Sequence, residues 1–165
     1  MNYSPKHNDM KMRILYGGLV ILSFVFMSVG KGTLGAIFKA LSILFLAAGL
    51  YLFIRHDLTS FSYIVMENGG RLDFYVNRTT GKRGAYVCYY PTSDIREIIK
   101  ISKDSKASLK ERYKNIYFFN YSKNVFCGEK YYIVFENQSR FDGVMIEPDE
   151  AFLNFLNSKI TKADS

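Results

Sequence analysis

Several residue types that support common chemistries are scarce in this chain of 165 residues. It has no tryptophan, two cysteines, two histidines and three prolines. Two cysteines cannot build the disulfide framework of a small secreted domain. A zinc site needs several ligands at close spacing, and neither His7 nor His56 has such neighbours in the sequence. The chain also lacks a glycine-rich phosphate-binding motif. The sequence therefore predicts no metal site and no cofactor.

The two cysteines do not suggest a nucleophile. Cys88 lies in a predicted strand and Cys127 in a predicted turn, and neither has a histidine near it in the sequence to act as a base. A disulfide between them and two free thiols both remain open, and the sequence favours the free thiols. The carboxylates are scattered singly. We therefore predict that the protein is not an enzyme. The alternative is a membrane-bound enzyme, which a deep pocket with perturbed titratable groups would indicate.

Positive charge is unevenly distributed along the chain. The net charge of +7 divides into +4 for residues 1–54 and +3 for residues 55–165. The second part is too mildly basic for the concentrated positive footprint of a nucleic-acid-binding domain. The sequence thus predicts no nucleic-acid partner.

Long hydrophobic runs are present only near the start of the chain. Ile14–Val29 and Ala40–Ile54 carry no charge, and each is somewhat shorter than the roughly 20 residues that span a bilayer as a helix. Flanking residues complete them, so we expect a transmembrane hairpin over residues 14–54, with helices at about 14–33 and 34–54. A tight loop around Lys31 would join the two helices. The hairpin separates an N-terminal tail, residues 1–13, from a β domain, residues 55–165.

Two other interpretations fit the hydrophobic runs less well. The first run could be a cleaved signal peptide, but it is long for that role and a second run follows it closely. Both runs could instead be buried helices of a soluble bundle. Such helices carry a polar face, and neither run has one.

The flanking charges predict which side of the cell membrane the soluble parts occupy. Basic residues are more frequent outside the hairpin than in its loop, so the positive-inside bias places both termini in the cytoplasm. The expected interface anchors are Tyr16, Lys39, Tyr51 and Arg55. Lys39 lies near the loop end of the second helix, where its long stem allows the ammonium group to reach the headgroups.

Beyond Arg55 the pattern changes to short aromatic and β-branched runs, which favour strands. Thr59–Glu67 and Arg71–Arg78 flank Asn68-Gly69, the strongest short signal for a β-hairpin. In the second run Leu72, Phe74 and Val76 alternate with polar residues and Tyr75. Gly84–Tyr90 is a third expected strand, ended by Pro91.

The second half of this domain is expected to contain further strands and one helix. Asp94–Ser102 fits either a strand or a helix, and Lys103–Lys114 is expected to be a loop. Asn115–Tyr121 and Lys130–Asn137 are expected to form a hairpin, and Phe141–Glu147 is expected to be the last strand. Residues 149–160 predict an amphipathic helix, because acidic residues occupy its first turn and its apolar residues form one stripe.

The order of these elements resembles a known family. Six or seven short antiparallel strands followed by one helix, with Val144–Asp149 leading into Ala151–Leu156, resemble the bacterial pleckstrin-homology-like (PH-like) domain. The resemblance implies an α+β fold: the transmembrane hairpin, then an antiparallel β-sandwich or partly open barrel capped by the C-terminal helix. The first hairpin loop has only Arg71 beside it, unlike the basic loop of phosphoinositide-binding members.

The sequence leaves three hypotheses about the function of the protein. The first is a membrane-tethered, non-enzymatic module that presents its PH-like surface to a membrane or cytoplasmic protein. The second is a module that senses anionic lipid through a basic segment. Each basic residue close to the membrane surface can contribute about 1 kcal/mol of attraction to anionic lipid. The third is the enzyme described above. The residues of the basic segment are Lys100, Lys103, Lys106, Lys110, Arg112 and Lys114.

Overall fold

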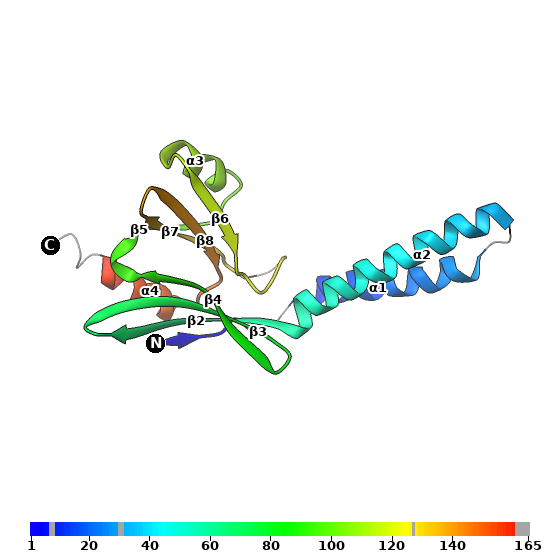
Figure 1. Ribbon diagram of the computed structural model, residues 1–165, viewed down its shortest axis with the longest axis horizontal. Coiled ribbons are helices and arrows are strands. Elements are labelled where there is room, and N and C mark those ends of the chain that lie inside the picture. Colours follow the sequence, from blue (N-terminus) through cyan, green and yellow to red (C-terminus); the bar gives the residue numbers. More distant parts are fainter. Residues whose placement is uncertain (7–8, 30–31, 127, 161–165) are drawn as a thin grey trace. The chain divides into compact units, whose positions relative to one another are not determined.

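The computed structural model describes residues 1–6, 9–29, 32–126 and 128–160 (Figure 1). His7, Lys31 and Cys127 lie outside these ranges. The structure therefore does not test the expected loop around Lys31 or the state of Cys127. The chain divides into two compact units. A helical unit comprises His7–Thr59 together with Asn124–Cys127, and a β unit comprises the remaining segments.

The helical unit is a pair of helices, α1 (Met10–Ser28) and α2 (Gly32–Phe53), followed by a π-helical turn, η1 (Ile54–Leu58). We had expected the first helix to extend toward the loop, but α1 takes its extra residues from its N-terminal side. The reason is an N-cap, because the Asp9 side chain accepts a hydrogen bond from the Met12 N–H. The helices thus differ from the expected 14–33 and 34–54. At 1.5 Å per residue, they are roughly 28 and 33 Å long, close to the hydrocarbon thickness of a bilayer.

Small residues allow α1 and α2 to pack closely. The buried positions of α2 are Gly35, Ser42 and Gly49, which recur every seven residues and so follow one face of the helix. A Cβ added to Gly49 would lie 2.9 Å from Val20 Cγ2 and 3.3 Å from the Tyr16 carbonyl oxygen of α1. Close contact through small residues is typical of helix pairs in membranes.

The first sheet has the order β1-β2-β3-β4. Its strands are β1 (Asn2–Tyr3), β2 (Thr59–Asn68), β3 (Arg71–Thr80) and β4 (Arg83–Pro91). The hairpin of β2 and β3 is as expected, but its turn falls on Gly69-Gly70, one residue later than Asn68-Gly69, because β2 extends through Asn68. Gly69 and Gly70 both have positive φ, as such a tight turn requires. The three strands expected between residues 59 and 90 are confirmed.

Strand β1 was not expected, because residues 1–13 read as a tail. Asn2 pairs with Ile64 and Tyr3 with Tyr63, and the terminal ammonium group of Met1 donates to the Val65 carbonyl oxygen at 2.6 Å. The residues before α1 and those after α2 therefore join the same sheet.

The second sheet has the order β5-β7-β8-β6. Its strands are β5 (Ile95–Lys100), β6 (Ile116–Asn120), β7 (Tyr131–Asn137) and β8 (Arg140–Ile146). The expected hairpin of β6 with β7 is wrong, because β6 pairs in parallel with β8 and β7 pairs with β5 and β8. Gly143 permits this pairing, since a Cβ there would lie 2.9 Å from the ring of its partner Phe118.

The expected loop over Lys103–Lys114 is also wrong, because Ser105–Arg112 forms helix α3. Its Leu109 is fully buried with Tyr132 and Val134 of β7 in a small core on one face of the second sheet. Figure 1 shows α3 beside this sheet. A single buried leucine anchors α3, which explains why the polar sequence gave no helical pattern.

The expected C-terminal helix is confirmed as α4 (Glu150–Ile160). The main core lies between the two sheets and α4. Aromatic rings join the sheets: the rings of Tyr90 and Phe135 stack with centroids 4.2 Å apart, and the Tyr90 hydroxyl donates to Asp142 at 2.9 Å. Phe152 and Leu156 of α4 are fully buried in this core. The sheets do not close into a barrel, so the expected α+β sandwich with a capping helix is confirmed, except that the second sheet is mixed.

Candidate functional site

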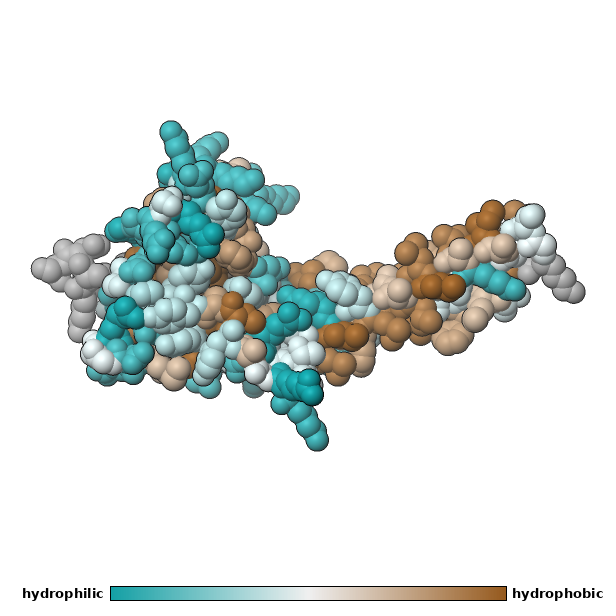
Figure 2. Space-filling model, in the orientation of Figure 1, coloured by the Kyte–Doolittle hydropathy of each residue, from teal (hydrophilic) through white to brown (hydrophobic). Residues whose placement is uncertain are grey.

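Helices α1 and α2 are both long and apolar enough to cross a membrane, and most of their residues are exposed. Figure 2 shows apolar residues along the helical pair, in contrast to the predominantly hydrophilic β unit. Residues such as Ile14 and Ile43 are more than two-thirds exposed. Core helices of a soluble bundle would bury such side chains.

The expected interface anchors occupy both ends of the helical pair. Tyr16 donates its hydroxyl to Asp57, which also pairs with Arg13 (Nη2–Oδ1, 3.2 Å). This cluster joins the start of α1 to η1. Tyr51 is 68% exposed, Lys39 is exposed near the start of α2, and Arg55 is half-buried in η1. Their role as anchors stays a prediction.

The basic segment is only partly available as a surface. Lys100 pairs with Glu129, and Arg112 pairs with Glu97 (Nη1–Oε2, 2.7 Å). Lys103, Lys106, Lys110 and Lys114 are exposed, but Lys106 also lies 5.0 Å from the centre of the Phe118 ring. Two of the six positive charges are thus neutralised locally, and lipid binding by the segment stays a prediction.

The outer face of the first sheet carries a cluster of tyrosines, which we call the tyrosine face: Tyr75, Tyr86 and Tyr89. The Tyr75 ring lies 5.3 Å from that of Tyr86 and 5.1 Å from that of Tyr89 (centroid distances). Tyr86 and Tyr89 are 60% and 44% exposed. The Arg71 guanidinium donates to the Tyr89 hydroxyl and pairs with Asp73 (Nε–Oδ1, 2.9 Å).

A β-bulge places these tyrosines on one face. Tyr86 and Tyr89 are three residues apart and would face opposite sides of a regular strand. The pairing of β3 with β4 shifts between Val76 and Asn77, so Tyr89 opposes Tyr75, Tyr86 opposes Asn77 and Val87 is left over. Sequence alternation predicts the outward side of Tyr75 but not the bulge, so the sequence analysis missed the cluster.

Strand β4 also provides a sheet edge. In the part of the chain that the structure describes, its outer edge pairs with no other strand. The N–H and C=O groups along such an edge can pair with an extended segment of another protein. Tyr86 and Tyr89 of the tyrosine face lie on this same strand.

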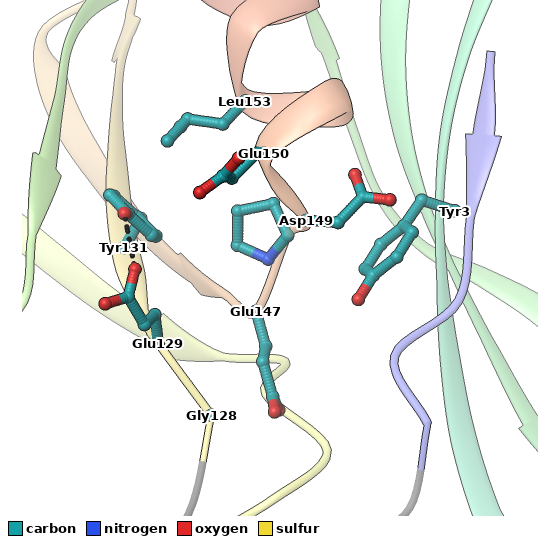
Figure 3. Close-up of a pocket in the computed structure, with 9 residues that line it drawn as sticks. Tyr3, Gly128, Glu129, Tyr131, Glu147, Asp149, Glu150 and Leu153 are labelled. Atoms are coloured by element: carbon teal, nitrogen blue, oxygen red, sulfur yellow. Dashed lines mark hydrogen bonds between the residues drawn. The ribbon is translucent and has the colours of Figure 1, made fainter.

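The β unit contains a cavity of about 350 Å³ at the start of α4 (Figure 3). Tyr3, Tyr131 and Leu153 line it together with four carboxylates, Glu129, Glu147, Asp149 and Glu150. Asp149 caps α4 by accepting from the Phe152 N–H at 2.8 Å, and hydrogen bonds from Lys100 and Tyr131 lower the pKa of Glu129. Burial, aided by Asp149 and Glu147, raises the pKa of Tyr3. Asp149 and Glu129 are thus both engaged in hydrogen bonds within the β unit. Among the described residues, no group of three His, Cys, Asp or Glu side chains could hold a metal ion.

Gly128, at the edge of this cavity, should be sensitive to substitution. Its φ is +82°, and an added Cβ would overlap the carboxyl group of Glu147, lying 2.7 Å from Cδ and 3.2 Å from Cγ. We expect Gly128→Ala to lower the free energy of unfolding by about 2 kcal/mol, from backbone strain and overpacking together. Gly81→Ala is the control, because it has a φ of +61° but open space around the Cβ. It should cost about 1 kcal/mol. Thermal unfolding of the full-length protein in mild detergent measures both, and equal losses would contradict the expected overlap.

Cys88 lies in β4 with its side chain toward the main core, and burial raises the pKa of its thiol to about 12. Because the thiolate is the reactive form, alkylation at pH 8 should be on the order of a thousandfold slower than for an exposed cysteine. Mass spectrometry of the peptide containing Cys88 measures the rate. An added cysteine at exposed Thr80 gives the reference. Similar rates at the two sites would contradict burial of the thiol.

Comparison with known families identifies the fold. A family model described as a bacterial PH-like domain (DUF6106) matches residues 5–163. This chain belongs to the bacterial PH-like domain family. Neither the curated proteins nor the solved structures gave a match.

The extent of the match is informative, because it includes α1 and α2 as well as the β unit. The helical pair is thus part of the PH-like family pattern and not an unrelated addition to this chain. PH-like domains are typically non-catalytic. In this PH-like protein the turn between β2 and β3 is Gly69-Gly70, with Arg71 as its only adjoining basic residue.

Proposed function

We propose that this protein is a non-enzymatic interaction module, tethered to the cell membrane by α1 and α2, that presents the tyrosine face and the edge of β4 to a partner protein in the cytoplasm. The observation that carries the proposal is the exposed tyrosine cluster beside an unpaired strand edge. Tyrosine and arginine are the residues that most often dominate binding energy at protein interfaces.

The fold supports a location of both termini on one side of the membrane. Strand β1 precedes α1, β2 follows α2, and the two strands pair with each other. A helical pair whose ends lead into one sheet must enter and leave the bilayer on the same side. The excess of basic residues at these ends, including Lys11 and Arg13, favours the cytoplasmic side.

The chemistry of the described residues supports a non-catalytic role. The thiol of Cys88 is held protonated by burial. Of the carboxylates around the cavity, Asp149 caps α4 and Glu129 accepts a hydrogen bond from Lys100. By contrast, Tyr86 and Tyr89 remain 60% and 44% exposed. Burying such aromatic side chains against a partner would contribute a large favourable free energy of binding.

Site-specific photo-crosslinking in intact cells tests the proposal. A photoreactive phenylalanine analogue at Tyr86 should yield a discrete crosslinked protein, which mass spectrometry can identify. The same analogue at Tyr117, which is 56% exposed on β6 of the other sheet, is the matched control. A product specific to position 86 supports the proposal, whereas equal products at both positions, or none at position 86, would contradict it.

A further inference from the structure

A short segment between β6 and β7 belongs to the helical unit, although its neighbours in sequence belong to the β unit. This segment, residues 124–126, is held by Asp9, the residue that caps α1. Asp9 Oδ2 accepts hydrogen bonds from the backbone N–H groups of Val125 at 2.9 Å and Phe126 at 2.8 Å. Its other oxygen accepts from the Met12 N–H at 3.3 Å.

Asp9 is well suited to hold this segment in place. The residue is 2% exposed. Burial alone would raise the pKa of the Asp9 carboxyl, but hydrogen bonds from Phe126, Val125 and Met12 outweigh this effect, and the pKa lies below its ordinary value. The carboxylate is therefore charged at neutral pH, and charge-assisted hydrogen bonds to backbone N–H groups are strong.

The side chains on this segment are unusual for a loop. Connecting segments are normally rich in small and polar residues, yet Val125 is 46% exposed and Phe126 is 58% exposed. At the same end of α1, Met10 is 65% exposed and Ile14 is 69% exposed. The apolar residues of the segment and the first turns of α1 thus lie at the same end of the helical unit, linked through Asp9.

The geometry points to a second membrane contact: we propose that Val125 and Phe126 insert into the headgroup–acyl boundary of the bilayer beside the start of α1. This inference rests on the proposed function, in which α1 crosses the membrane. Asp9 then lies at the level of the headgroups, and its two hydrogen bonds fix the backbone of the segment at that level. A bilayer is the occupant that fits, because the apolar surface of the segment adjoins the apolar surface of the helical pair.

The absence of tryptophan makes the proposal directly testable, because one substitution introduces a unique fluorophore. Three full-length single-tryptophan variants are reconstituted into phosphatidylcholine vesicles that carry bromine at either shallow or deep positions of the acyl chains. Phe126→Trp reports on the segment, Ile21→Trp on the middle of α1, and Tyr86→Trp on the tyrosine face. All three positions are more than half exposed, so each should accept the larger ring.

The expected result separates this inference from the proposed function. Insertion of about 5–10 Å predicts that shallow bromines quench F126W roughly twofold more strongly than deep bromines. I21W should show the opposite depth preference, and Y86W should be quenched only by aqueous acrylamide. If I21W is quenched by lipid but F126W is not, the segment does not insert and this inference fails alone. If I21W is not quenched by lipid, the proposed membrane tether fails as well.

A second variant tests the role assigned to Asp9. In Asp9→Ala no side-chain oxygen remains to accept from the Val125 and Phe126 N–H groups, so the segment should lose both of these hydrogen bonds. Quenching of F126W by shallow bromines should then fall at least to half, while quenching by acrylamide rises. Unchanged lipid quenching in D9A would contradict the positioning of the segment by Asp9.

Discussion

Replacing Tyr86 and Tyr89 together with serine is expected to weaken binding of the partner by at least thirtyfold. The two rings are the most exposed members of the tyrosine face, and both contact Tyr75. Truncating an interface tyrosine that dominates binding costs about 2 kcal/mol or more, and 1.4 kcal/mol corresponds to a factor of ten, so one such tyrosine in the pair is enough for the thirtyfold loss. The measurement is a titration of the detergent-solubilised full-length protein against the partner that is crosslinked at position 86.

Tyr117→Ser is the matched control for this prediction, because it removes an equally exposed tyrosine from the second sheet. It should leave the affinity within about twofold of the original value, as expected of residues outside a hot spot. The double variant should keep its fold, since neither ring belongs to the main core. An affinity that falls equally in both variants would show that the tyrosine face is not the binding surface.

Gly49→Leu is expected to force α1 and α2 apart. The space for a side chain at this position is already occupied, since Val20 Cγ2, the Tyr16 carbonyl oxygen and Leu19 Cβ all lie within 3.5 Å of an ideal Cβ. Helix axes lie 8–10 Å apart according to the side chains at the contact, so a leucine should increase the separation by about 2 Å. Spin labels attached to cysteines at Ile21 and Leu44, in a background lacking Cys88 and Cys127, report this distance by pulsed electron paramagnetic resonance.

Gly18→Leu is the control, because it introduces the same residue on α1 where nothing lies within 4 Å of an added Cβ. The distance between the labels should be unchanged in this variant and longer in Gly49→Leu. A distance that is the same in all three proteins would contradict the close packing of the helical pair through Gly49.

The elements that could be predicted from the sequence are those whose signal is local. The two charge-free runs indicated α1 and α2, and the alternation of Leu72, Phe74 and Val76 indicated β3 and its buried face. The glycines after Asn68 indicated the turn between β2 and β3. Each signal depends only on residues close to one another in the chain.

The elements that escaped prediction depend on distant partners. Strand β1 consists of two residues that become a strand only by pairing with β2, and α3 depends on burial of Leu109 beneath β7. The parallel pairing of β6 depends on Gly143 in a different strand. The tyrosine face depends on a bulge that no local sequence pattern predicts. The contact of Asp9 with Val125 and Phe126 joins residues more than a hundred positions apart.

Cysteine accessibility in intact cells tests most directly whether the helical pair crosses the membrane with both ends in the cytoplasm. In a background without Cys88 and Cys127, single cysteines replace Thr33 at the start of α2 and Ser60 in β2, which are both exposed. A membrane-impermeant maleimide should label the cysteine at position 33 in intact cells and the one at position 60 only after permeabilisation. Labelling of position 60 in intact cells, or failure to label position 33 until permeabilisation, would contradict this topology.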